Sequence, residues 1–288
     1  MNSTTPMSRP QGHPKPGPET TDDSARGARR GSSRDIPAGL EYQQVVAATN
    51  PAWWRGVVAI LLIVAGLFVF TIPVQIVGAL LNTSLGLVDP SAPPAFTPIT
   101  HLTNLVGVAL LIPWSMLVQR WLFGVRPGSL HSVASHFRFD VFGRAMFFLL
   151  PVYTIYMGVM SLGEVKTTTW TPIAIVAAIV VTILFAPLQS AAEEYGFRGV
   201  VFRVAASWGA GPRMRLAIGI VVSAALFAMI HMAADPWLNF YYFTLGAGLA
   251  VITWRTGGIE TAVVLHVRSI GRVRRCCQAV ASLVERLC

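Results

Sequence analysis

The chain has 288 residues, of which 53% are hydrophobic and only 12% are charged. This composition is typical of an integral membrane protein and excludes an ordinary soluble domain. The formal net charge of +9 is dispersed over short loops between apolar runs, and no nucleic-acid-binding module is found, so we expect no nucleic-acid partner.

Residues 1–45 are rich in Pro, Gly, Ser and Thr and contain few large apolar side chains. A segment of this kind cannot bury enough surface to offset the entropy that is lost when it is ordered. We therefore predict a disordered cytoplasmic tail. Arg29 and Arg30 lie too far from the first apolar run to belong to an export signal, so the tail is expected to remain attached.

Apolar runs after this tail predict an all-α fold, a polytopic transmembrane helical bundle with about seven spans, the last of them truncated or altered. The expected spans are 57–81, 103–122, 145–163, 171 to about 207, 216–233, 237–254 and a seventh from about 259. They divide the chain into N-terminal transmembrane helices (50–165), a core (166–267) and an atypical basic tail (268–288).

The loops between these spans differ in charge. One side carries most of the arginines, and the other carries Asp89, Glu164, Lys166 and Asp235. Because cytoplasmic loops are enriched in Lys and Arg, this alternation predicts a cytoplasmic N-terminus. Close helix contacts are expected at Gly219, Ser223, Gly246 and Gly248.

Two adjacent glutamates, Glu193 and Glu194, follow the uncharged run 167–192. A carboxylate beside hydrocarbon is costly and implies a partner, water or a reaction. Glu194 and Arg198 are spaced i and i+4 on a helix and can pair, whereas Glu193 points about 100° away and has no partner nearby in sequence. This geometry favours one held carboxylate and one that is free to take a proton. The alternative is that both mark the water-facing end of a span.

Two histidines also lie within predicted spans: His231, deep in the fifth, and His266, in the seventh. Phe227 lies one turn before His231, on the same face. A single histidine in a span is more often structural than catalytic. Two histidines and an unpaired glutamate on three spans favour a site. His101 is expected at the outer interface, and His131 in a solvated loop.

These residues resemble the CAAX protease and bacteriocin-processing (Abi) family of intramembrane endopeptidases, which includes the type 2 CAAX prenyl endopeptidases. The first family motif, two glutamates and then an arginine four residues after the second, is similar to Glu193-Glu194-Tyr195-Gly196-Phe197-Arg198. The second, phenylalanine and histidine four apart, is similar to Phe227 and His231. In the third, a histidine is followed four residues later by asparagine or aspartate; His266 fits, but Ile270 does not. The resemblance covers residues 170 to 266.

The resemblance implies a role for each motif residue. Glu193 would be the general base that activates a water for attack on a peptide carbonyl, and Glu194 would pair with Arg198. His231 would position the water or bind a metal, and His266 would position the water or contribute to the oxyanion environment. Glu193, His231 and His266 could supply three ligands to a divalent cation such as zinc, but their spacing does not establish a metal site.

The tail after Val267 departs from the family pattern, because five arginines and all three cysteines replace the expected apolar continuation. One hypothesis is a change of reading frame near residue 267. The alternative is a basic amphipathic helix at the membrane interface. If the tail is authentic, the expected oxyanion donor is absent, and loss of one such donor costs on the order of 10²–10³ in rate.

The resulting prediction is an intramembrane metalloendopeptidase of the multi-pass type in a bacterial plasma membrane, with activity reduced if the tail is authentic. Its expected partners are the lipid bilayer and a membrane-associated peptide, either a prenylated CAAX-like tail or a bacteriocin-type leader. Two alternatives stay open: a non-catalytic scaffold or bacteriocin-immunity protein of the same fold, and a proton-coupled transporter. The natural substrate and the oligomeric state are left open.

Overall fold

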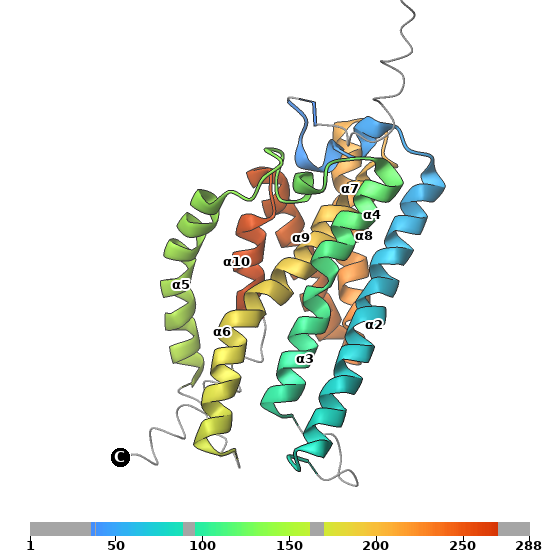
Figure 1. Ribbon diagram of the computed structural model, residues 1–288. Helices are drawn as coiled ribbons and strands as arrows, with labels where there is room; N and C mark the ends of the chain where they lie inside the picture. The colour runs from blue at the N-terminus through green and yellow to red at the C-terminus, as the bar shows by residue number, and fades with distance from the viewer. Residues whose placement is uncertain (1–35, 38, 89–95, 162–169, 270–288) are drawn as a thin grey trace, which may run out of the picture. The chain divides into compact units, whose positions relative to one another are not determined.

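The computed structural model describes residues 36–37, 39–88, 96–161 and 170–269, and these residues form helices and no strand (Figure 1). The predicted all-α fold is therefore confirmed for this part of the chain. The longer helices are α2 (Trp53–Ser84), α3 (Pro98–Ala109), α4 (Leu111–Phe123), α5 (Phe139–Ser161), α6 (Pro172–Glu194), α8 (Pro212–Ile230), α9 (Pro236–Thr256) and α10 (Glu260–Ser269).

Four helical stretches among the described residues are long and apolar enough to cross a membrane: Trp53–Ser84, Pro98–Phe123, Pro172–Ala206 and Pro212–Ile230. The chain is an integral membrane protein, as its composition predicts. The other three expected spans fall on α5, α9 and the ten-residue α10. The total of about seven spans therefore stays a prediction, and the tail from residue 270 lies outside the described residues.

The second span begins earlier than expected, at Pro98 rather than near residue 103. Thr97 caps it, since its Oγ1 accepts a hydrogen bond from the backbone N–H of Thr100 at 3.1 Å, and Pro98 occupies the first helical position. The span consists of α3 and α4, which meet at Leu110. The sequence prediction missed this cap because it located the span from apolar residues alone.

The fourth span continues past the glutamates, as expected, but its winding changes there. The π-helical segment η5 (Tyr195–Phe202) follows α6 and leads into the short helix α7 (Arg203–Ala206). Ser223 on α8 supports this segment by donating its hydroxyl to the backbone carbonyl of Phe197 at 3.1 Å. A π-helical turn inside an α-helix is often found at a functional site.

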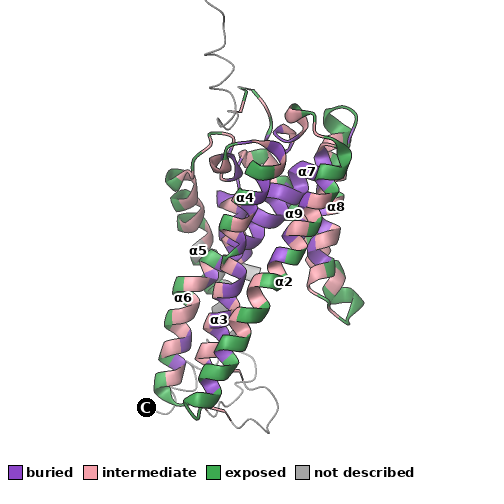
Figure 2. Cartoon of the chain, turned by 45° about the vertical axis from the view of Figure 1, so that its right-hand side comes forward, coloured by how far each residue is buried: buried purple, intermediate pink, exposed green. Residues whose placement is uncertain are grey.

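Buried residues gather around η5, α7, α4 and α9, whereas the far end of α2, residues 71–84, exposes most of its side chains (Figure 2). Two of the four predicted close contacts involve glycines at this core. A Cβ on Gly219 would lie 2.7 Å from the Phe202 ring, and one on Gly246 would lie 3.1 Å from the Cα of Ala224. A Cβ on Gly248 would meet no atom of another element within 4 Å among the described residues, so the close contact predicted there is not found in this part of the chain.

Part of the segment assigned to the disordered tail is packed in this core. Tyr42 has 0% exposure, and its hydroxyl donates to the backbone carbonyl of Leu130 at 2.7 Å. The tail boundary at residue 45 is therefore too late. Composition averaged over the segment concealed its few large apolar residues, which find their partners far along the chain. Residues 1–35 lie outside the described residues.

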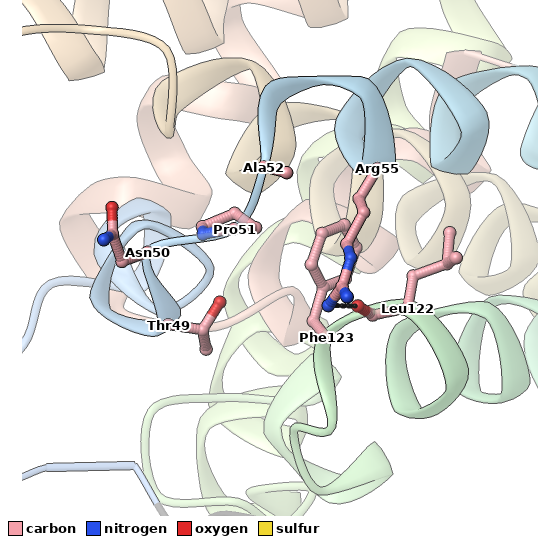
Figure 3. A pocket seen from close by; sticks show the side chains of 7 residues that line it. All are labelled: Thr49, Asn50, Pro51, Ala52, Arg55, Leu122 and Phe123. Carbon is pink, nitrogen blue, oxygen red and sulfur yellow. Dashed lines mark hydrogen bonds between the residues drawn. The ribbon is translucent and has the colours of Figure 1, made fainter.

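A cavity of about 220 Å³ lies between the start of α2 and the end of α4 (Figure 3). Arg55 extends along it, and its Nη1 donates to the backbone carbonyl of Leu122 at 3.3 Å. The other lining residues are Thr49, Asn50, Pro51, Ala52 and Phe123. No residue of the predicted site lines this cavity.

Candidate active site

Glu194 and Arg198 form the predicted pair. Glu194 Oε1 lies 3.1 Å from Arg198 Nη1, and both side chains are completely buried. Arg198 also donates from Nη2 to the backbone carbonyl of Gly246 at 3.3 Å, so the guanidinium connects η5 to α9. Because a buried charge is tolerated only when it is paired and hydrogen-bonded, these contacts explain how Arg198 occupies the core.

His266 brings the two glutamates into one cluster. Its Nδ1 lies 2.7 Å from Glu194 Oε1, and its Nε2 lies 3.2 Å from Glu193 Oε2. Only 3% of His266 is exposed, and only 7% of Glu193. A residue of α10 thus bridges adjacent carboxylates on α6, a contact that no spacing in the sequence could show.

Glu193 has a partner one turn earlier on its own helix. Gln189 Nε2 donates a hydrogen bond to Glu193 Oε1. The expectation that Glu193 has no partner nearby in sequence is therefore wrong. The spacing i and i+4 could have revealed this contact, because it is the same spacing that relates Glu194 to Arg198.

His231 lies at the end of its helix rather than deep within it. Helix α8 ends at Ile230, His231 caps it, and the following Met232 takes a positive φ of 45°. His231 Nδ1 donates to the backbone carbonyl of Phe227 at 2.7 Å, which leaves Nε2 as the acceptor of a neutral ring. The imidazole stacks on Tyr242 of α9, with ring centroids 3.8 Å apart.

Phe227 connects the two histidines and the arginine. Its ring centroid lies 4.6 Å from that of His231 and 5.4 Å from that of His266. The Arg198 guanidinium carbon lies 4.4 Å from the same ring, within cation–π range. A completely buried aromatic ring thus holds side chains from η5, α8 and α10 around one point. The phenylalanine of the second motif is a packing centre for the cluster.

Residues 170–268 match the family model described as type II CAAX prenyl endopeptidase Rce1-like. Over these residues, about a third of the chain, the protein is similar to that family. The match contains every residue of the cluster and ends at Arg268, the first residue of the tail that departs from the pattern. Comparisons with curated proteins and with solved structures gave no match.

The start of α10 in the Rce1-like segment is anchored by an ion pair that sequence reasoning missed. Arg138 donates from Nε to Glu260 Oε1 at 2.9 Å and from Nη2 to Glu260 Oε2 at 2.8 Å. Glu260 is completely buried, and it begins the helix that carries His266. A bidentate pair fixes orientation as well as distance, so it sets the position of α10. An acidic residue at the start of an apolar run was the only signal in the sequence.

The loop before α5 contacts both η5 and the start of α10. The His131 imidazole is hydrogen-bonded through Nδ1 to the Tyr195 hydroxyl, and the His131 backbone carbonyl accepts from the N–H of Ile259 at 3.0 Å. His131 is therefore half-buried rather than solvated. His101 is also buried within the protein, and its Nε2 lies 2.9 Å from Thr182 Oγ1; its depth at the outer interface stays a prediction.

A metal site is not formed by these side chains. Within the described ranges, no group of three or more His, Cys, Asp or Glu residues is placed to hold a metal ion. His266 directs both ring nitrogens at carboxylate oxygens, and His231 directs Nδ1 at a backbone carbonyl. The arrangement of Glu193, His231 and His266 does not fit three-ligand coordination, and a metal requirement stays a prediction.

Proposed function

We propose that this protein is an intramembrane endopeptidase that hydrolyses a peptide bond of a membrane-associated peptide, with Glu193 as the general base. The observation that supports this most directly is the buried cluster of Glu193, Glu194 and His266. Two of its members lie within the helix Pro172–Ala206, which is long and apolar enough to span the membrane. The Rce1-like family of residues 170–268 points to a protease.

The two carboxylates have different surroundings, which suits them to different roles. Glu194 is neutralised by Arg198 and contacts His266, so it holds the cluster together. Glu193 has no cationic arginine within ion-pair distance among the described residues, and its Oε2 faces His266. Glu193 is therefore the carboxylate that accepts a proton from the attacking water.

In the proposed reaction, the water oxygen attacks the scissile carbonyl carbon while Glu193 takes the proton. The resulting tetrahedral oxyanion needs hydrogen-bond donors. In this proposal His266 Nε2 supplies one, because it turns from Glu193 Oε2 to the oxyanion once the carboxylate has taken the proton. Glu193 then returns the proton to the leaving amine, so the C–N bond breaks and the carboxylate is restored. His231 offers Nε2 to the water as a second acceptor.

The proposed substrates are peptides held at the membrane, either a prenylated CAAX-like tail or a bacteriocin-type leader. An active site inside the bilayer receives such peptides directly from the lipid. The family match does not favour the scaffold, immunity-protein or transporter alternatives.

The test is cleavage of a quenched, prenylated CAAX-type peptide by the purified full chain in liposomes. Glu193→Gln keeps the size of the side chain and removes the base, so we expect cleavage to fall by at least about 10²-fold. Glu41→Gln is the matched control, because Glu41 is exposed and lies outside the cluster. Cleavage by Glu193→Gln at the wild-type rate would refute the proposed base.

A bacteriocin-type leader peptide in the same assay separates the two substrate classes. Treatment of the protein with a chelator tests whether cleavage requires a metal ion. Cleavage that survives prolonged dialysis against EDTA would show that the reaction needs no divalent cation. Loss of cleavage that zinc restores would show that a metal is required.

A further inference from the structure

Gln189 is a buried residue beside Glu193 that has no role in the reaction proposed above. It lies on α6 one turn before Glu193, and only 9% of it is exposed. Its amide donates to Glu193 Oε1. A carboxylate can only accept hydrogen bonds, so the NH₂ group of the amide must face Glu193, and Oε1 of Gln189 must point elsewhere.

That amide oxygen has no hydrogen-bond partner among the described residues. Gln189 Oε1, Ser190 Oγ and Glu194 Oε2 are all buried and lack a hydrogen-bond partner within the described part of the chain. A buried polar atom left without a partner is destabilising, so native proteins rarely leave such atoms unmatched. Three such oxygens within about one and a half turns of the same helix indicate that donors other than the described residues complete the site.

The spacing along α6 fits one kind of donor, the main-chain N–H of an extended peptide. Gln189 and Glu193 are four residues apart, which is about 6 Å along a helix at 1.5 Å per residue. An extended peptide advances about 6.6 Å over two residues, and its alternate residues present the same edge. A substrate lying along α6 with its scissile carbonyl at Glu193 would therefore bring the N–H of a residue two positions away to Gln189.

We propose that Gln189 is a further residue of the site with two functions. Its Nε2 positions the Glu193 carboxylate so that Oε2 faces His266 and the reacting water. Its Oε1 accepts a hydrogen bond from a main-chain N–H of the substrate, two residues from the scissile bond. The positioning role of Nε2 rests on the proposed function. The contact made by Oε1 holds for any extended peptide bound along α6.

The first part is tested by turnover. A hydrogen bond to a charged group is the stronger kind, so Gln189→Leu should lower kcat about tenfold to 100-fold. Gln189→Glu removes the donor but keeps an acceptor, and it should lower kcat to a similar extent. Gln75→Leu is the matched control, because Gln75 is a part-buried helical glutamine that donates to Asn104 at 3.1 Å on α2 and α3. An unchanged kcat in Gln189→Leu would overturn the positioning role.

The second part is tested by binding and needs no turnover. The probe is the prenylated CAAX-type peptide with a ketomethylene group in place of the scissile amide. In single analogues, an ester replaces the amide two residues to either side, which removes one N–H without adding bulk. We expect one of the two esters to weaken the Kd of the wild type about twofold to tenfold.

The same ester should have no effect on Gln189→Leu and should keep its effect on Gln189→Glu and Gln75→Leu. Equal weakening in wild type and Gln189→Leu, or no binding of the parent analogue by the wild type, would overturn the contact. If wild-type protein binds in this pattern but cleaves nothing, the proposed function fails and Gln189 remains a peptide-binding residue. If the wild type cleaves the peptide but neither ester weakens its binding, the proposed endopeptidase function is retained and the contact between Gln189 Oε1 and the substrate is wrong. Gln189→Glu provides the test if Gln189→Leu does not fold.

Discussion

The two halves of the helix Pro172–Ala206 have opposite surroundings. In the first half, large apolar side chains such as Ile173 and Ile183 are mostly exposed, at 79% and 66%. In the second half, every residue from Ala192 to Ala206 is buried. One continuous helix therefore passes from a lipid-facing half into a half that is enclosed by protein.

This difference explains where charge can be placed in the chain. Arg203 lies in the enclosed half with 0% exposure, and its Nη1 donates to Gln119 Oε1 at 2.8 Å while its Nε donates to the backbone carbonyl of Tyr42 at 3.1 Å. The lipid-facing half of the same helix contains no charged residue. Protein partners thus replace water around the charges, and chemistry with ionised groups becomes feasible at membrane depth.

The largest effect should come from breaking the buried ion pair of the enclosed half. Glu194→Leu leaves the Arg198 guanidinium in the core without its carboxylate. Removing one member of a buried pair costs about 3–5 kcal/mol, so we expect the free energy of unfolding to fall by that amount. Unfolding by SDS titration in mixed micelles measures it. A change below about 1 kcal/mol would show that Arg198 reaches another partner or water.

A smaller loss should follow from filling the close helix contact beside this pair. In Gly246→Val, the new Cβ would lie 3.1 Å from the Cα of Ala224 and 3.3 Å from the Phe227 ring. Overpacking of this kind typically costs about 1–3 kcal/mol in unfolding free energy. Gly248→Val is the matched control, since a Cβ on Gly248 would meet no atom of another element within 4 Å in the described part of the chain. Equal destabilisation by both substitutions would contradict the contact.

A further prediction concerns how folding stability depends on pH through His131, which contacts the enclosed half of the helix at Tyr195. Burial lowers the pKa of His131 from its usual 6.5, with the charge of Glu260 opposing the shift and His136 adding to it. The folded protein then binds fewer protons than the unfolded chain below pH 6.5. The contribution of His131 is complete above that pH and is lost as the pH falls toward the lowered value.

This prediction is measured as the difference in melting temperature between wild type and His131→Asn. Asparagine retains a polar contact for the Tyr195 hydroxyl and does not titrate. The wild type should lose more stability than the variant between pH 7.5 and 5. Parallel curves for the two proteins would show that His131 takes up its proton equally in the folded and unfolded chains.

The smallest effect is expected in the lipid-facing half. Ile183→Ala removes a side chain that is 66% exposed, so little protein packing is lost. We expect the unfolding free energy to change by no more than about 0.5 kcal/mol in the same SDS titration. A loss comparable to that of Gly246→Val would indicate that this face of α6 packs against protein rather than lipid.

The sequence by itself determined the membrane class, the all-α fold and the residues that form the cluster. Composition and apolar length decide the class, because the bilayer requires helices of a certain length. The spacing of Glu194 and Arg198 decides their pairing, because residues four apart share a helix face. The same rule could have revealed the contact between Gln189 and Glu193.

Only the tertiary structure decided which distant groups meet. His266 reaches both glutamates, Arg138 anchors α10 through Glu260, and Tyr42 packs under Arg203 at 4.6 Å, in each case across many residues of chain. The π-helical winding after Glu194 and the end of α8 at His231 also arise from packing. Sequence periodicity describes one helix at a time. The relative placement of helices depends on the side chains of all of them together.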